Sequence, residues 1–295
     1  MNAAREEQTD DQIIIKVLMA TFNRVEDTLN CLQSLFSSQL DSSIKIRVIL
    51  VDAGSSDGTL DRVAALNKDI DSYSASPDHY WAMAMRKAWL IAQESSYDFL
   101  LWLNDDVTLS GNAIQQLVNT SQAEKSTNVV VGAVKSEETG KTTYSGYRTP
   151  SPTRRLQLQM LNPTNEVQRC DTLNGNVVLA SSASDYAVDG FPKGYGHGLA
   201  DIAYGFELTR KKIPILLMPD YVGTCERQIP LKLWLDPSVP INARLRALRG
   251  PKGLPIRTWS KFCIRYGGPL GVVNAVKPYA QTITLNVIGF RRKAS

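Results

Sequence analysis

The chain has 295 residues, of which 43% are hydrophobic and 21% are charged, so it is long enough to bury a full-sized core and lacks the composition of a disordered chain. Its four cysteines are widely spaced without a CxxC pair, and it has only two histidines, which excludes a disulfide framework, a cysteine zinc site and a multi-histidine metal centre. The first ten residues contain no apolar core of a signal peptide, and no apolar run approaches the length of a membrane-spanning helix. We therefore expect a protein on the cytoplasmic side of the membrane.

Residues 13–134 alternate between apolar, β-branched segments and segments with apolar residues at helical spacing. Residues 1–12 precede them as a polar lead-in that we expect to be disordered. Strands and helices in this order, with short connections, predict an α/β fold with a doubly wound, mostly parallel sheet. The expected strands are 13–19, 44–51, 70–74, 99–103 and 129–134, and the expected helices are 25–40, 60–66, 81–94 and 111–124.

The second half of the chain is less regular. Residues 137–165 are polar and rich in Thr, Ser and Pro, and we interpret them as a loop that lies over a site. A further strand is expected at 172–180 and a late strand at 213–218, with a glycine-spaced loop at 194–198 leading into a helix between them.

Polar residues follow three of the expected strands. They are Asn23-Arg24, the Gly-, Ser- and Asp-rich segment 52–59, and Asn104-Asp105-Asp106. Such loops meet at the carboxyl edge of a parallel sheet, where ligands bind. Neither GxGxxG nor GxxxxGK[ST] is present, so a site with several carboxylates would need a divalent metal to offset a bound diphosphate. The alternative is that residues 104–106 only form a polar turn after their strand.

Six segments share the order and spacing of one enzyme family. They are 20–24 (ATFNR), 51–59 (VDAGSSDGT), 80–85 (YWAMAM), 103–107 (LNDDV), 173–176 (LNGN) and 198–205 (GLADIAYG). Together they resemble the family 2 glycosyltransferases of GT-A type, especially bacterial rhamnosyltransferase-like members. The resemblance implies a GT-A, Rossmann-like catalytic domain over residues 13–228, followed by a basic, mainly helical extension over 229–295.

The resemblance also implies which residues bind the nucleotide-sugar donor. Thr21, Asn23 and Arg24 are expected to line the nucleotide pocket, and Asp52 is expected to face the base. Trp81 would pack near the donor. A core position for Trp81 remains the alternative.

The remaining roles concern the metal, the chemistry and the acceptor. By resemblance, residues 104–106 occupy the position of the family's DxD motif, with Asp106 as the ligand of Mg²⁺ or Mn²⁺ and Asp105 beside the donor ribose or sugar. Asp201 falls at the position of the catalytic base. Without the resemblance it would be interpreted as an acid stabilised at a helix N-terminus. The residues expected on the acceptor side are Gly175, Asn176 and His197.

The resemblance implies an inverting, metal-dependent glycosyltransferase. It would move a sugar from a deoxythymidine or uridine diphosphate donor, with rhamnose as the first candidate, to a hydroxyl of a glycan or lipid-linked acceptor in polysaccharide biosynthesis. The metal would stabilise charge on the leaving diphosphate, and a carboxylate would accept the proton of the acceptor hydroxyl. Guanosine donors remain open.

Three residues near Asp201 depart from the family pattern. Ala200 precedes it, Ala203 replaces a second Asp, and Glu207 stands where Arg is common. These departures support an alternative function, that of a catalytically weakened nucleotide-sugar-binding protein that organises a glycan assembly complex. A nucleotidyltransferase is disfavoured because its glycine- and lysine-rich first loop is missing.

The basic residues are concentrated at the C-terminal end. Residues 237–295 contain 11 of the 33 Lys and Arg residues and no acid, which leaves 22 basic against 29 acidic residues in the rest of the chain. Leu, Ile, Trp and Phe residues lie between these charges, a mixture typical of short helices at an anionic membrane surface. A solvated surface and a nucleic-acid-binding surface are the alternatives, and we favour the membrane over nucleic acid.

Overall fold

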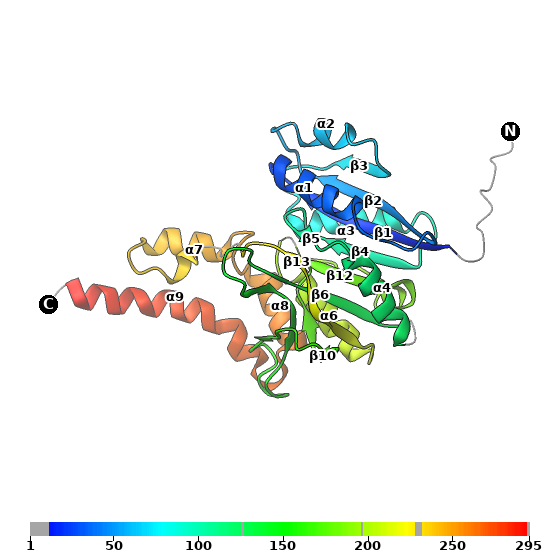
Figure 1. The fold of residues 1–295 in the computed structure, drawn as a ribbon. Helices are drawn as coiled ribbons and strands as arrows, with labels where there is room; N and C mark the ends of the chain where they lie inside the picture. Colours follow the sequence, from blue (N-terminus) through cyan, green and yellow to red (C-terminus); the bar gives the residue numbers. More distant parts are fainter. Residues whose placement is uncertain (1–11, 125–126, 196, 228–231, 294–295) are drawn as a thin grey trace.

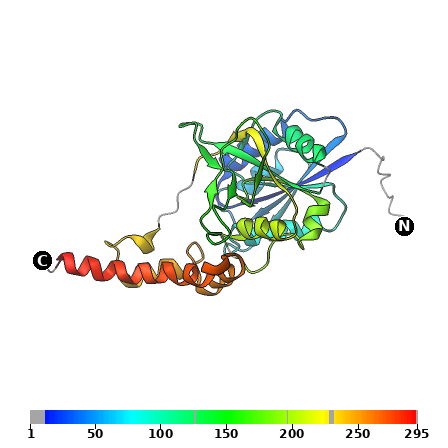
Figure 2. The same cartoon turned by 90° about the horizontal axis from the view of Figure 1, so that it is seen from below.

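The computed structural model describes residues 12–124, 127–195, 197–227 and 232–293, with side chains described as far as residue 284. The chain forms an α/β body, from which a helical extension projects on one side (Figures 1 and 2). The expected lead-in, apart from residue 12, and the expected domain boundary after residue 228 lie outside the described residues.

Strands form one large and one small sheet. The strands of the large sheet are β1 (Ile13–Thr21), β2 (Ile44–Asp52), β3 (Ile70–Ser74), β4 (Phe99–Leu103), β5 (Thr108–Leu109), β6 (Val129–Lys135), β7 (Thr142–Tyr144), β10 (Gln168–Cys170), β12 (Val177–Ser181) and β13 (Ile215–Thr224). The main path of this sheet has the order β10-β13-β6-β12-β4-β1-β2-β3, with β5 beside β13 and β7 beside β6. The small sheet contains β8 (Gly146–Arg148), β9 (Gln159–Met160) and β11 (Thr172–Leu173).

The first half of the large sheet is parallel and the second half is mixed. β3, β2, β1 and β4 run parallel, whereas β12 is antiparallel to both β4 and β6. The backbone N–H of Asn104, just after β4, donates to the carbonyl of Asn176, just before β12 (3.0 Å). The antiparallel pairing therefore brings residues 104–106 beside residues 174–176.

Helices cover both faces of this sheet and confirm the predicted α/β class. The helices of the body are α1 (Val25–Phe36), α2 (Thr59–Ala64), α3 (Trp81–Ala92), α4 (Ala113–Ala123), α5 (Ser182–Ala187) and α6 (Ala200–Arg210). Buried residues of α1, α2 and α4 pack against one face of the sheet, and buried residues of α3 and α6 pack against the other.

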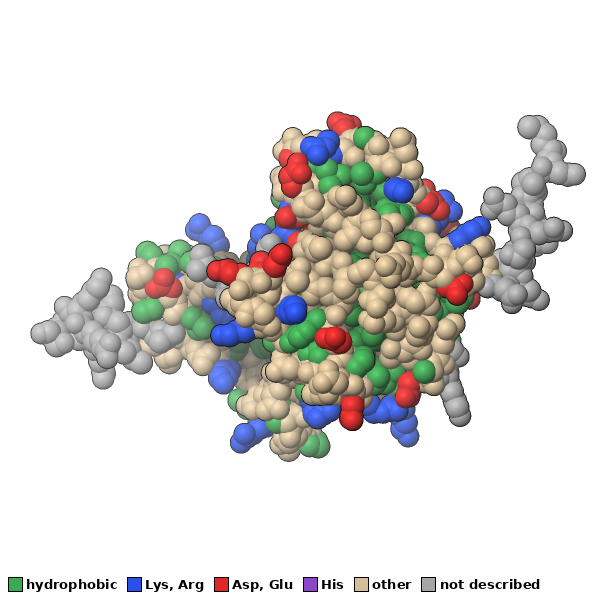
Figure 3. Space-filling view, viewed as in Figure 1, with side chains coloured by type: hydrophobic (Ala, Val, Ile, Leu, Met, Phe, Trp, Pro, Cys, Tyr) green, Lys and Arg blue, Asp and Glu red, His purple; other side chains and the backbone are tan. Residues whose placement is uncertain are grey.

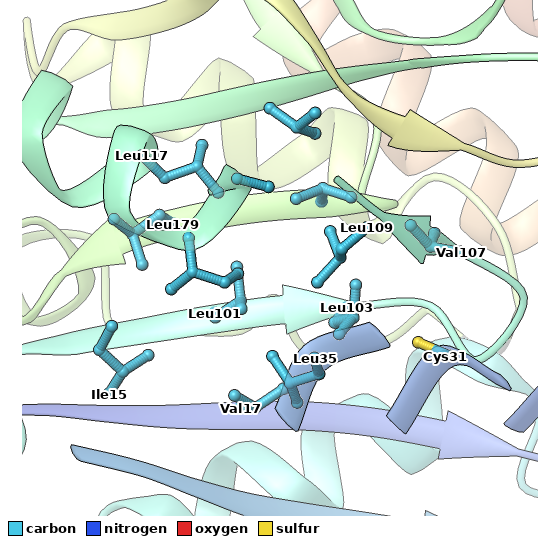
Figure 4. Close-up of a cluster of buried hydrophobic side chains, with 14 of the residues drawn as sticks. Ile15, Val17, Cys31, Leu35, Leu101, Leu103, Val107, Leu109, Leu117 and Leu179 are labelled. Atoms are coloured by element: carbon cyan, nitrogen blue, oxygen red, sulfur yellow. The ribbon is translucent and has the colours of Figure 1, made fainter. Parts of the chain in front are cut away.

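The apolar run of β4 is explained by burial on both faces. Leu101 and Leu103 point into the core under α1 and α4 (Figure 4), and Leu100 and Trp102 point into the core under α3 and α6. Side chains alternate along a strand, so a strand covered on both faces needs apolar residues at every position.

The C-terminal extension consists of two short 3₁₀ helices, Leu233–Leu235 and Gly268–Leu270, and the helices α7 (Ile241–Arg249), α8 (Ile256–Tyr266) and α9 (Gly271–Lys293). Phe206 of α6 packs with Phe262 and Tyr266 of α8 in a third apolar cluster. Glu207 of α6 forms an ion pair with Arg265 (2.7 Å), so α8 is fixed to the body. Within the described residues, no helix combines the length and apolar character needed to cross a membrane.

The late strand expected at 213–218 is β13, which continues to Thr224, and β10 and α5 were not expected. Two further differences concern segments that contribute residues to the cavity. The strand expected at 172–180 is divided into β11 and β12, because the chain turns at Asn174-Gly175-Asn176. The expected loop at 137–165 contains the short strands β7, β8 and β9. β12 pairs with β4, far from it in the sequence, and local residue patterns do not encode such pairing. β7 and β9 pair with the neighbouring strands β6 and β8, but they are only two or three residues long, too short for a periodic pattern to show.

Candidate active site

A cavity of about 400 Å³ lies at the carboxyl ends of the parallel strands. Its wall is formed by Thr21 at the end of β1, the residues after β4, the first turn of α3, and Asp201 at the start of α6. This is the edge of an open α/β sheet at which ligands bind. Eight of the residues expected at the site line the cavity: Thr21, Arg24, Trp81, Asp105, Asp106, Gly175, His197 and Asp201.

Two adjacent carboxylates share one guanidinium. Arg24 Nη1 lies 3.2 Å from Asp105 Oδ1 and 3.0 Å from Asp106 Oδ2. Asp105 is buried, and this burial, with the neighbouring Asp106, raises the pKa of Asp105 to about 7, although Arg24 opposes the shift. The two acids therefore form an acidic wall that already holds one cationic group, Arg24.

The second oxygen of Asp106 contacts a thiol. Cys225 Sγ lies 3.5 Å from Asp106 Oδ1. Burial, together with the charge of Asp106, raises the pKa of Cys225 to about 12, so the thiol stays protonated and donates to the carboxylate. Cys225, the residue after β13, thus helps to orient Asp106.

Trp81 connects the acid segment to helix α3. Its indole Nε1 donates to Asn104 Oδ1 (2.9 Å), and its ring packs edge-to-face on Phe191 (5.9 Å between centroids). The amide that replaces the first acid of the expected motif therefore accepts a hydrogen bond from Trp81. The sequence left open whether Trp81 belongs to the core or to the site. Its side chain does both, because it packs partly in the core and also lines the cavity.

Gly175 lies where Trp81 and Asp201 meet. A Cβ atom at Gly175 would lie 2.6 Å from Cη2 of Trp81 and 3.2 Å from Cβ of Asp201. Contacts this short require a side-chain shift, so only glycine lets the two side chains approach the same backbone position.

Asp201 is positioned by the start of α6. Its Oδ2 accepts hydrogen bonds from the Gly175 N–H (3.1 Å) and the Asn174 side chain (3.2 Å), and its Oδ1 accepts from the Ile202 N–H (2.8 Å). Burial raises the pKa of Asp201, while the hydrogen bonds from Gly175 and Ile202 oppose that shift. A carboxylate with a raised pKa is a better proton acceptor than an exposed one.

A second glycine sets the position of the whole helix. A Cβ atom at Gly205 would lie 2.4 Å from Oγ1 of Thr172 and 2.7 Å from its Cα. Helix α6 thereby packs directly on strand β11, and Asp201 at its start is held beside Gly175.

Three residues expected at the site lie outside the cavity lining. Asp52 is buried and accepts a hydrogen bond from the Ser55 N–H (3.0 Å). Asn23 has a left-handed backbone (φ 50°) and accepts from the Ser56 N–H (2.8 Å). Both join the loop after β1 to the loop after β2. Asn176 is buried, and its carbonyl accepts the hydrogen bond from the Asn104 N–H described above.

The structure adds cavity residues that the sequence analysis missed. Tyr144 of β7 and Asn174 line the cavity, and so does Lys252, which lies between α7 and α8. The sequence signal for Tyr144 was the prediction that residues 137–165 lie over a site. Lys252 had only the general signal of a basic C-terminal end.

The acid pair suits a divalent cation shared with a ligand. Magnesium and manganese are held in proteins by one or two carboxylates, with waters and substrate phosphates completing the coordination. Asp105 and Asp106 supply two such carboxylates on the cavity wall. No group of three or more His, Cys, Asp or Glu side chains suited to a metal occurs among the described residues, so the chain alone does not complete a coordination shell. The donor set therefore fits a cation that is bound together with phosphate oxygens.

Comparisons with known proteins agree with this geometry. Residues 16–176 match the family model described as Glycosyl transferase family 2. The fold is similar to that of a structure of GalNAc-T7 with UDP, GalNAc and Mn²⁺, with a TM-score of 0.58, 13% identity, and coverage of 78% of this chain and 47% of that chain. It is also similar to the mannosyltransferase PcManGT from Pyrobaculum calidifontis in complex with GDP-Man and Mn²⁺, with a TM-score of 0.54, 15% identity, and coverage of 95% of this chain and 74% of that chain. This chain thus spans about half the length of the GalNAc-T7 structure.

No curated protein matches the chain. Sequence identities of 13% and 15% establish a shared GT-A-like fold and nothing beyond it. The family model, however, covers more than half of the 295 residues, including the strand ends that carry the acid pair. The chain therefore belongs to glycosyltransferase family 2.

Proposed function

We propose that the protein is an inverting glycosyltransferase that moves a sugar from a nucleoside-diphosphate donor to a hydroxyl of a glycan or lipid-linked acceptor in polysaccharide biosynthesis. The observation that carries this proposal is the placement of three acids around one cavity. Asp105 and Asp106 lie on one wall, and Asp201 lies on another, with Gly175 and Trp81 between them. We call the first wall, with Thr21, Arg24, Asp105 and Asp106, the donor end. We call the second, with Gly175, His197, Asp201 and Lys252, the acceptor end.

The proposed reaction is a single displacement. The acceptor oxygen forms a bond to the anomeric carbon while the bond from that carbon to the diphosphate oxygen breaks, and the bonding electrons leave with the diphosphate. Asp201 accepts the proton of the attacking hydroxyl. Its Oδ2 is oriented by Gly175 and Asn174, which fixes the carboxylate before the acceptor arrives.

At the donor end, positive charge must balance the leaving group. Arg24 is already directed at the acid pair by two ion pairs and is placed to contact a diphosphate bound there. Asp106, with Asp105 beside it, would hold Mg²⁺ or Mn²⁺, which stabilises negative charge on the departing diphosphate when bound. Thr21 lines the same end and would contact the nucleoside.

The donor is proposed to be a deoxythymidine or uridine diphosphate sugar, with rhamnose as the first candidate sugar. The solved structures of similar fold contain UDP in one case and GDP-mannose in the other, so the fold accepts more than one base. A thermal-shift screen of nucleoside diphosphates with Mn²⁺ separates these donors. We expect one base to raise the melting temperature more than the others, and chelation of the metal to abolish that shift.

The deciding experiment is a transfer and hydrolysis assay with a panel of nucleotide sugars, with Mn²⁺ and with a chelator. We expect metal-dependent release of the nucleoside diphosphate from one donor. An alternative function, a nucleotide-sugar-binding protein that organises an assembly complex, is supported by Ala203 and Glu207. Ala203 is buried, and Glu207 is used in the ion pair with Arg265 rather than in the cavity. Donor binding without any turnover over the whole panel would favour this alternative.

We also propose that the extension binds an anionic membrane surface. Val272, Val276 and Ile283 lie on one face of α9 and are 68%, 58% and 54% exposed. Hydrophobic side chains and Lys or Arg side chains also lie next to one another on the extension in Figure 3, and residues 237–295 contain no acid to repel lipid phosphates.

Vesicle flotation tests this surface. The full chain should float with vesicles that contain anionic lipid and remain at the bottom with neutral vesicles. Val272→Glu with Val276→Glu should abolish flotation, whereas Val167→Glu, at an exposed apolar position of the body, should not. Equal flotation of both variants would contradict the proposal.

A further inference from the structure

The connection between α7 and α8 carries Lys252 to the wall of the cavity. This connection is tightly folded. The Gly253 N–H donates to the Gly250 carbonyl (2.9 Å), and the Leu254 N–H donates to the Leu248 carbonyl (2.7 Å). The Tyr279 hydroxyl of α9 donates to the Leu254 carbonyl (2.5 Å). The backbone just after Lys252 is therefore held by hydrogen bonds to two helices of the extension, α7 and α9.

Gly253 shows how close the packing is. A Cβ atom at this position would lie 2.3 Å from the Ala247 carbonyl oxygen and 2.5 Å from the Leu248 carbonyl oxygen. Backbone oxygens cannot move aside as a flexible side chain can, so residue 253 must be glycine for this turn to form. The turn that carries Lys252 is thus specified by the sequence.

Lys252 and Arg24 differ in whether an acidic side chain pairs with their charge. Arg24 is paired with both acids of the donor end. Lys252 forms no ion pair with any residue in the described part of the chain. It therefore brings a positive charge to the cavity that no described carboxylate neutralises.

His197 lies at the same end of the cavity. It lines the wall with Gly198 and Asp201, and its ring packs edge-to-face on Tyr80 (5.7 Å between centroids). Its Nδ1 is buried and has no hydrogen-bond partner among the described residues. Lys252 lines the same cavity. Burial, and to a lesser extent the charge of Lys252, lower the pKa of His197, which favours the neutral imidazole. A neutral imidazole still offers one N–H donor to a ligand.

Basic residues continue outward from Lys252. Arg246 and Arg249 of α7 line a neighbouring hollow together with Gly250, only two positions before Lys252. Both arginines are exposed. Three basic residues, Arg246, Arg249 and Lys252, thus lie within one short stretch of chain that leads from α7 to the cavity wall.

We propose that Lys252, together with His197, binds a phosphate or diphosphate group of the acceptor. The inference rests on the proposed transferase function and specifies its acceptor as an anionic molecule, either a lipid diphosphate that carries a sugar or a phosphorylated glycan. The charge of the donor is balanced at the other end of the cavity, by Arg24 and the cation that the acid pair would hold. The positive charge of Lys252, at the acceptor end, is therefore available to bind a second anion. This anion would lie next to Asp201, the proposed proton acceptor.

Binding measurements test this proposal without requiring turnover. Titration calorimetry with the full chain uses three probes: farnesyl diphosphate, inorganic pyrophosphate and glucose 1-phosphate. Each is added in saturating nucleoside diphosphate and Mn²⁺, so that the donor end is already filled. Farnesyl diphosphate is used below its critical micelle concentration, which keeps detergent-like association out of the signal. We expect at least one probe to bind with a stoichiometry of one.

The variants identify the residue. Lys252→Ala should weaken probe binding about tenfold or more, the effect of removing one charge-assisted hydrogen bond, and Lys252→Arg should retain it. The matched control is Lys261→Ala, which removes an exposed lysine on α8 of the same extension and should leave binding unchanged. Nucleoside diphosphate affinity should be the same in all four proteins.

The outcomes distinguish a lipid diphosphate from a phosphorylated glycan, and they also show when the proposal fails. Binding of farnesyl diphosphate alone indicates a lipid-linked acceptor, and binding of glucose 1-phosphate indicates a phosphorylated glycan. If no probe binds, or if Lys252→Ala binds the probes as the unmodified protein does, the proposal is overturned. A loss of nucleoside diphosphate affinity in Lys252→Ala would also overturn it, because Lys252 would then belong to the donor. Failure of the transferase proposal would instead appear as an absence of sugar transfer in the donor panel, which these titrations do not measure.

Discussion

The donor end and the acceptor end of the cavity are built in different ways. At the donor end, Thr21 is the last residue of a parallel strand, Arg24, Asp105 and Asp106 come shortly after parallel strands, and Arg24 joins both acids by ion pairs. The acceptor end combines the turn before β12, the start of α6 and a connection in the extension. The donor end is therefore fixed by the sheet, whereas the acceptor end depends on how α6 and the extension pack onto it. Changes of charge should affect both ends, but changes of volume should affect the acceptor end most.

The largest effect is expected from removing the proposed proton acceptor, Asp201. Asp201→Asn keeps the shape of the side chain but cannot accept a proton, so sugar transfer should fall by about 1,000-fold. Donor affinity should remain, because Asp201 belongs to the acceptor end. Steady-state rates and titration of the donor measure the two quantities separately. A variant with unchanged turnover would remove Asp201 from the mechanism.

A smaller loss is expected at the donor end. Asp106→Ala should lower transfer by about 100-fold, equivalent to about 3 kcal/mol of transition-state stabilisation, and should raise the Mn²⁺ concentration required for half-maximal rate. Asp220→Ala, which removes an exposed carboxylate of β13, is the control and should change neither. If the two variants depended on Mn²⁺ in the same way, Asp106 would not be the metal ligand.

A volume change should act mainly at the acceptor end. Gly175→Ala places a methyl group 2.6 Å from Trp81 and 3.2 Å from Asp201, which should cost about 2 kcal/mol of unfolding free energy and displace Asp201 from its hydrogen bonds. Gly111→Ala has no atom within 4 Å of the added carbon and serves as the matched control. The free energy of unfolding, measured in urea, and the rate of sugar transfer should both fall in Gly175→Ala and stay unchanged in Gly111→Ala. Equal stability of the two variants would show that the contact at Gly175 is not tight.

The smallest effect concerns pH. Burial raises the pKa of Asp201 above its ordinary value of 3.8, so the folded protein binds this proton more tightly than the unfolded chain does. The stabilisation from this group is fully present below pH 3.8 and is lost as the pH rises through the folded-state pKa. Relative to Asp201→Asn, the unmodified protein should therefore lose unfolding free energy as the pH rises above 3.8. A constant difference between the two proteins in urea unfolding at several pH values would contradict the shift.

The same contrast explains what the sequence could predict. Strand β4 and its acids form one continuous segment, so an unbroken apolar run followed by Asn104-Asp105-Asp106 was enough to place the donor end at the edge of a sheet. Asp201 was predicted through the resemblance of residues 198–205, and it lines the cavity, while its catalytic role stays a prediction. Lys252 lies far from both in the sequence, and its position in the cavity follows from the packing of α8 against α6, through contacts such as Phe206 with Phe262. Local patterns do not contain such packing.

Asp52 and Asn23 were expected to contact the nucleotide, but their side chains do not line the cavity. Both stand in segments that resemble the family, and their segments do border the site. Their side chains, however, bond to Ser55 and Ser56 and connect two loops. A polar residue in a turn often serves the backbone rather than a ligand, and a sequence shows which residues are polar but not which way they point. Their nucleotide-binding roles stay predictions.

The most direct test of the division between the two ends is the configuration of the first product. A proton acceptor at Asp201, with the diphosphate held by the acid pair, implies attack on the face of the sugar opposite the leaving diphosphate. Proton NMR of the anomeric centre, followed from the start of the reaction with the accepted donor, should show a product of configuration opposite to that of the donor. A first product with the donor's own configuration would contradict the single displacement, and with it the role of Asp201.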